Sequence, residues 1–147
     1  MQRWIVAIAI GLITWLGWGG VSPAWAETYQ SPAPDSAEVY FIAPSNGETV
    51  TSPVTVKFGL RGMGVAPAGV DKPDTGHHHL LVDLATLPNL DESLPATDHI
   101  KHFGGGQTET TLDLPPGEHT LQLLLANYVH VPYAPPVVSD KITVTVN

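Results

Sequence analysis

The chain has 147 residues, no cysteine and a formal net charge of −8 at pH 7. The lack of cysteine excludes disulfides, thiolate nucleophiles and thiolate metal ligands, as well as lipid attachment through an N-terminal cysteine. The excess of acidic side chains argues against nucleic acids and anionic membranes as partners and favours cations.

The first 26 residues have the pattern of a secretory signal peptide. Arg3 precedes an apolar run over residues 4–16, and Ala24 and Ala26 supply small residues at the −3 and −1 positions of a cleavage site. We therefore expect cleavage after Ala26 and a location in the periplasm or outside the cell, with no stable membrane insertion afterwards. The alternative is an uncleaved anchor, because residues 4–21 approach the ~20 apolar residues that span a bilayer.

Cleavage would leave 121 residues, enough for one domain with a single core. Five basic and 14 acidic side chains then give a net charge of −9. Residues 27–37 are polar and contain two prolines, which predicts a flexible leader. Residues 38–147 are expected to form the folded domain.

In this domain, short apolar segments alternate with turn residues, and no long helical periodicity occurs. The predicted strands are residues 39–42, 54–60, 78–84, 108–114, 119–126 and 141–146. Leu124 lies on the opposite face of its segment from Leu121, Leu123 and Leu125, which indicates a strand buried on both sides. The pattern predicts an all-β fold, an immunoglobulin-like antiparallel β-sandwich of about seven strands. Two long loops, over residues 62–76 and 85–106, are expected to be functional or mobile.

Seven histidines are the main functional signal, and three of them are consecutive. On a strand, His77 and His79 face the same side with Cα atoms roughly 6.5–7 Å apart, so both rings can bind one metal ion. His78 faces the other way, in line with Leu80 and Val82. We therefore predict that His78 is a packed, hydrogen-bonded core residue.

A second pair, His99 and His102, lies in the second long loop. A single helical turn would place both rings on one side, and folding of the loop over the strand would bring them to His77 and His79. Neutral imidazole is the commonest metal ligand and suits zinc and copper(II). Because binding needs the neutral ring, affinity is expected to fall toward pH 5.

The last two histidines have weaker signals. His119 follows a Pro-Gly corner, which favours a structural ring bonded to a backbone group. For His130, a role as a metal ligand and a role as a loop anchor both remain open.

The motifs GHHHLL (residues 76–81), HFGGGQTE (102–109) and PGEHTLQL (116–123) resemble those of a family of small exported bacterial domains of unknown function. The resemblance covers residues 42–146. Members of that family often carry a second histidine three residues after the equivalent of His130, where this chain has Tyr133. The resemblance implies an exported, histidine-centred domain and no particular activity.

Two hypotheses follow. The first is a metal-binding β-sandwich that holds copper(II) or zinc through His77, His79, His99, His102 and His130. The second is a non-catalytic module that binds another exported protein or a cell-envelope polymer, with histidines that stabilise its loops through hydrogen bonds. An enzyme is less favoured, because no nucleophile elbow or other catalytic motif is present.

Overall fold

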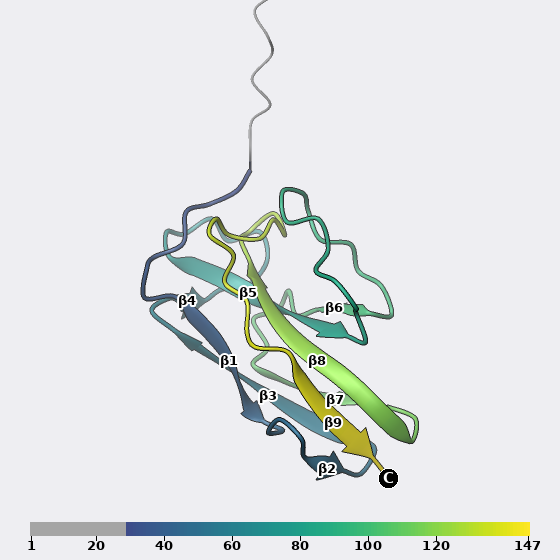
Figure 1. The fold of residues 1–147 in the computed structure, drawn as a ribbon. Coiled ribbons are helices and arrows are strands. Elements are labelled where there is room, and N and C mark those ends of the chain that lie inside the picture. Colours follow the sequence, from purple (N-terminus) through teal and green to yellow (C-terminus); the bar gives the residue numbers. More distant parts are fainter. Residues whose placement is uncertain (1–28) are drawn as a thin grey trace, which may run out of the picture.

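The computed structural model describes residues 29–147 and contains only strands and loops within that range. The predicted signal peptide, residues 1–26, lies outside the described residues. Between Tyr29 and Asn147 no helix occurs that is long and apolar enough to cross a membrane. The prediction of an all-β fold is confirmed, and the strands form two sheets packed face to face (Figure 1).

The smaller sheet has three antiparallel strands in the order β1-β3-β7. These strands are β1 (Glu38–Ala43), β3 (Val54–Arg61) and β7 (Glu109–Leu112). The period-two pattern of β3 places Val54, Val56 and Phe58 on one face, and all three are buried against the other sheet.

The larger sheet has the order β2-β9-β8-β5-β4, and β6 also pairs with β5. Its strands are β2 (Thr49–Val50), β4 (Gly64–Val65), β5 (Thr75–Val82), β6 (Ile100–His102), β8 (Gly117–Ala126) and β9 (Ile142–Val146). The pairs β2–β9 and β4–β5 are parallel. The sheet is therefore mixed, and the described residues hold nine strands, whereas the sequence predicts about seven antiparallel ones.

The main hydrophobic core fills the space between the two sheets. From the larger sheet, alternate residues of β5 and β8 enter this core, including Leu80, Leu121 and Leu123, each with 0% exposure. Burial of a leucine or valine side chain stabilises a fold by about 1.5–3 kcal/mol, so this core supplies most of the stability of a domain without disulfides.

A second apolar cluster lies on the outer face of the larger sheet. It consists of Leu81, Leu94, Ile100, Leu124 and Ala126. Leu124 is fully buried there, which confirms the prediction that its strand is covered on both sides. The cover comes from the loop between β5 and β6, which brings Leu94 over the sheet.

The described part of the leader lies against the domain. Pro32 forms a β-bridge with Ala134, and the Ala33 amide donates to the Ala134 carbonyl at 3.2 Å. The Gln30 side chain donates to the Leu90 carbonyl at 2.9 Å. In place of the flexible leader expected from composition, this segment thus makes specific backbone contacts. The described chain starts at the end of the sandwich where the long loops gather, and its C-terminus lies at the opposite end (Figure 1).

Candidate metal centre

Three histidines converge on the outer face of the larger sheet. His77 and His79 are two residues apart on β5, and β6 pairs with β5 in a register that sets His102 opposite His79. One ring nitrogen from each residue lies within 4.8 Å of the other two. We call His77, His79 and His102 the three-histidine cluster.

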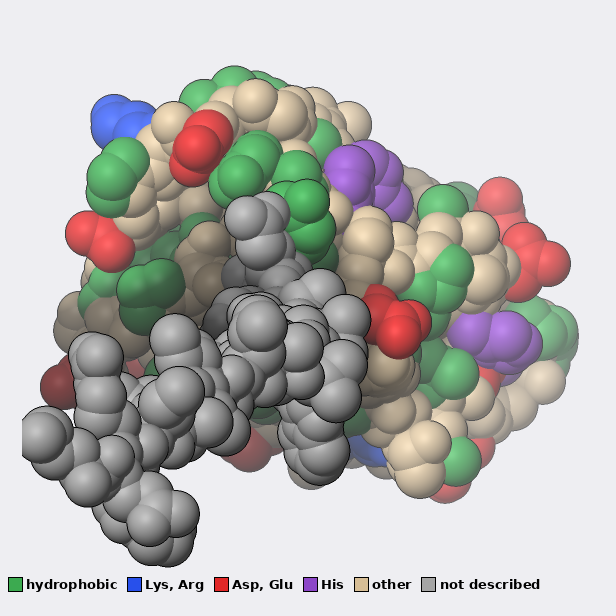
Figure 2. All heavy atoms as spheres, turned by 90° about the horizontal axis from the view of Figure 1, so that it is seen from above, with side chains coloured by type: hydrophobic (Ala, Val, Ile, Leu, Met, Phe, Trp, Pro, Cys, Tyr) green, Lys and Arg blue, Asp and Glu red, His purple; other side chains and the backbone are tan. Residues whose placement is uncertain are grey.

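The cluster has one buried side and one open side. His77 is 0% exposed and His79 1% exposed, because the strand and its neighbour β8 lie beneath them. His102, at the end of β6, is exposed. Histidine side chains reach the surface at two separate places on the face shown in Figure 2. A metal ion could therefore approach a cluster whose inner ligands are already fixed by the sheet.

Neither ring nitrogen of His77 or of His79 has a hydrogen-bond partner among the described residues. An unpartnered buried polar atom costs about 1–3 kcal/mol, and such atoms are rare in folded proteins. Metal coordination would use one nitrogen of each ring. Buried His78 shares this feature, so it is the convergence of His77 and His79 with His102 that distinguishes the cluster as a candidate metal centre.

Burial also keeps the two inner rings neutral. It lowers the pKa of His77 to about 4, and the neighbouring His102 and His130 rings add to the effect. Burial likewise lowers the pKa of His79 to about 3. Neutral imidazole is the form that coordinates metals, so both rings are in the binding form at neutral pH.

His130 lies at the edge of the cluster. Its ring centroid is 4.7 Å from that of His102 and 5.1 Å from that of His77, but 6.3 Å from that of His79. It is half-buried, and its backbone has a φ of 69°, a left-handed conformation that is unfavourable for a non-glycine residue. Strain of this kind persists only where the surroundings enforce it and is common at functional sites.

Asn127 enforces the conformation of this loop. It is 1% exposed, and its Oδ1 accepts hydrogen bonds from the amides of Val129 and Val131, each at 3.1 Å. Its Nδ2 donates to the Tyr29 carbonyl at 2.7 Å and to Ser31 Oγ at 3.0 Å. One buried side chain thus ties the His130 loop to the start of the described chain.

Replacing Asn127 with alanine is therefore expected to destabilise the protein by about 1–3 kcal/mol. The amides of Val129 and Val131 and the carbonyl of Tyr29 would lose their hydrogen-bond partner. Urea unfolding of the metal-free variant measures this change. A midpoint equal to that of the wild type would contradict the role assigned to Asn127.

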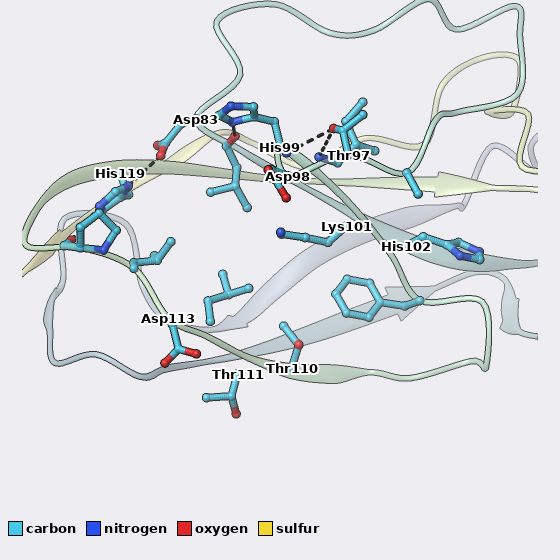
Figure 3. Close-up of a pocket in the computed structure, with 17 residues that line it drawn as sticks. Asp83, Thr97, Asp98, His99, Lys101, His102, Thr110, Thr111, Asp113 and His119 are labelled. Atoms are coloured by element: carbon cyan, nitrogen blue, oxygen red, sulfur yellow. Dashed lines mark hydrogen bonds and ion pairs between the residues drawn. The ribbon is translucent and has the colours of Figure 1, made fainter.

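His99 does not join the cluster. It precedes β6, and its Nδ1 donates to the Val82 carbonyl at 2.9 Å. The sequence expectation placed His99 and His102 on one helical turn, but residues 100–102 form the extended strand β6 and His99 lies in the bend before it. Residues three apart on an extended chain lie about 10 Å apart and point to opposite sides. In Figure 3 the ring of His102 projects away from His99.

The remaining two histidines are structural. His119 donates from Nδ1 to Asp83 Oδ2 at 2.7 Å and from Nε2 to the Pro115 carbonyl at 2.9 Å, as the sequence predicts for a corner residue (Figure 3). His78 is 0% exposed and packs on Phe58 with ring centroids 5.3 Å apart. The packing of His78 agrees with the prediction, and the backbones of Gly59 and Gln107 lie close enough to its ring to offset part of the lowering of its pKa by burial.

A groove of about 1220 Å³ runs between β6 and β7, beside the cluster. His102 lies at one end, and the Asp83–His119 pair lies at the other (Figure 3). Because the Pro115 carbonyl occupies Nε2 of His119, this pair has no free nitrogen to act as a catalytic base.

Together these features define an all-β domain with a candidate metal centre on one sheet face. The chain belongs to the family described as domain of unknown function (DUF4399), whose model matches residues 56–147. The matched range contains the cluster residues, and the match bears out the resemblance to a family of unknown function noted from the sequence.

Other comparisons add little. A search of curated proteins gave no match. Among solved structures, the chain is similar to the endo-beta-1,4-mannanase from Thermotoga petrophila, with 20% identity and a TM-score of 0.45 over 76% of this chain. That similarity covers 20% of the mannanase chain. It therefore carries no inference about activity.

Proposed function

We propose that this protein is an exported transition-metal-binding domain that holds its ion through the three-histidine cluster. The supporting observation is that buried, neutral His77 and His79 have orphaned ring nitrogens within 4.8 Å of a ring nitrogen of His102. Histidines that serve only as loop-stabilising hydrogen-bond donors would have partners, as His99 and His119 do. Export rests on the signal-peptide pattern of residues 1–26.

The separations of the ring centroids are closer to those of a tetrahedral zinc site than to those of a square-planar copper(II) site. The three ring centroids are 4.9, 5.0 and 5.1 Å apart, close to an equilateral triangle. Imidazoles bound tetrahedrally at about 2.0–2.1 Å from zinc would have centroids about 5 Å apart. Three corners of a square-planar copper(II) site would instead give two separations of about 4.5 Å and one of about 6.4 Å. The fourth corner is open to His130 or to a small ligand.

Calorimetric titration of untagged mature protein with zinc and copper(II) at neutral pH tests the proposal. One ion per chain is expected to bind to the wild type, and the double variant His77→Ala/His79→Ala is expected to lose that site. His99→Ala is the matched control, because it removes an exposed histidine outside the cluster and should leave binding intact. Binding no tighter than that of scattered surface histidines, or unchanged in the double variant, would refute the proposed function.

A further inference from the structure

Gly104 lies directly beside the ring of His102. A Cβ atom on Gly104 would lie 2.5 Å from His102 Nε2 and closer still to Cε1, and 3.3 Å from the Cβ of Ala68. Real Cβ atoms essentially never approach another heavy atom within 3.0 Å. The imidazole of His102 thus occupies the space that any side chain at position 104 would fill.

The need for glycine here is one of space and not of backbone conformation. Among the described glycines with positive φ, Gly106 is in the same loop, at 80°, whereas Gly104 is not one of them. The Gly104 carbonyl accepts a hydrogen bond from the Ala68 amide at 2.8 Å, which fixes the backbone under the ring. An alanine could keep this backbone, but the His102 ring would have to move.

We propose that Gly104 is a positioning residue that holds the His102 ring in the three-histidine cluster by leaving its own side-chain position empty. His102 is exposed, so the displaced ring has solvent to move into and the fold has little reason to change. The effect of Gly104 on metal affinity rests on the proposed function. The position of the ring is a property of the metal-free protein as well.

The first measurement therefore needs no metal. In the metal-free wild type, nuclear Overhauser contacts are expected between the rings of His102 and His77, whose centroids are 5.0 Å apart. These contacts should vanish in Gly104→Ala and persist in Gly64→Ala. Gly64 is a matched control, because a Cβ there meets only the Thr75 Cγ2 at 3.4 Å and the Asp74 carbonyl at 4.0 Å. Persistence of the contacts in Gly104→Ala would overturn the inference, whatever the metal affinity.

The second measurement is a double-mutant cycle on zinc affinity. Gly104→Ala should weaken binding about tenfold to a hundredfold, as loss of a ligand-orienting residue typically does. In a His102→Ala background the same change should have no further effect, because its target is gone. An equal loss in both backgrounds would show that Gly104 acts through the loop and would refute the inference. Absence of both zinc and copper(II) binding by the wild type would refute the proposed function and leave the metal-free measurement to decide the role of Gly104.

Discussion

Replacing His79 with leucine is expected to make the metal-free protein more stable while removing its response to zinc. The side chain of His79 is 1% exposed, and among residues 29–147 neither of its ring nitrogens has a side-chain or backbone group in hydrogen-bond geometry. Its neighbours on the outer face include Leu124, directly across on β8, and Leu81 further along β5. A leucine of similar size fits these surroundings and removes a buried unsatisfied group, so the free energy of unfolding should rise by about 1–3 kcal/mol.

With excess zinc, the wild type should become more stable than the His79→Leu variant. A ligand at a thousand times its Kd stabilises the folded state by about 4.1 kcal/mol, and the variant lacks a ligand needed to receive that benefit. Urea unfolding with a chelator and then with excess zinc measures both effects.

His78→Leu is the matched control for this experiment. His78 is as buried as His79, but it faces the main core beside Phe58, with the backbones of Gly59 and Gln107 next to its ring. Because His78 lies outside the cluster, the His78→Leu protein should still be stabilised by zinc. A metal-free His79→Leu protein that is less stable than the wild type would show that the His79 ring nitrogens have hydrogen-bond partners in the native state. That result would contradict the role of His79 as an unpartnered ring of the three-histidine cluster.

The second large effect concerns the Asp83–His119 pair. Both ring nitrogens of His119 donate hydrogen bonds, which requires the charged imidazolium. The hydrogen bond to Asp83 is the main cause that raises the pKa of His119 above its usual value. Because the folded-state pKa is raised, the stability from His119 is fully present below its unfolded pKa of about 6.5 and is lost as pH rises through the folded pKa.

Asp83→Asn should therefore lower stability below about pH 6.5 and matter less at alkaline pH. The loss at acidic pH should be on the order of 1 kcal/mol, since the Asp83 side chain is 37% exposed and solvent screens the pair. Asp83 Oδ1 also accepts from the Thr120 amide, a bond that the asparagine carbonyl can keep.

The measurement is the difference between wild type and variant in urea unfolding across pH, with a chelator present. The difference between the two proteins is needed because three buried histidines make the stability of both proteins depend on pH in the direction opposite to His119. These histidines are His77, His78 and His79. Their pKa values are lowered, so the stability they contribute is present above about pH 6.5 and falls as pH drops toward 4. A difference that is independent of pH would show that His119 is not charged in the folded protein.

The sequence pattern was sufficient for the long strands. Period-two alternation located β3, β8 and β9 to within one or two residues and identified the common face of His77 and His79. It did not reveal β2, β4 and β6. These strands have two or three residues, and their structure depends on pairing with distant partners that no local pattern encodes.

Which histidines form the cluster could not be predicted fully, because the position of His102 depends on β6, one of these short strands. His102 reaches His79 because β6 pairs with β5 in the register that joins them, which is a tertiary contact. The helical turn assumed for residues 99–102 would have included His99, but an extended chain directs it elsewhere. A signal for the role of Gly104 was present in the sequence as a run of three glycines, although their spacing alone could not show which one adjoins a ring.

The position of the cluster has a consequence for how the domain handles its ion. The cluster lies on the outer face of the larger sheet, whereas the main hydrophobic core lies between the sheets and contains none of the three cluster histidines. In small zinc domains that fold only around their ion, loss of metal means unfolding. Under the proposed function, the sandwich would persist without its ion, which would suit the protein to repeated loading and release.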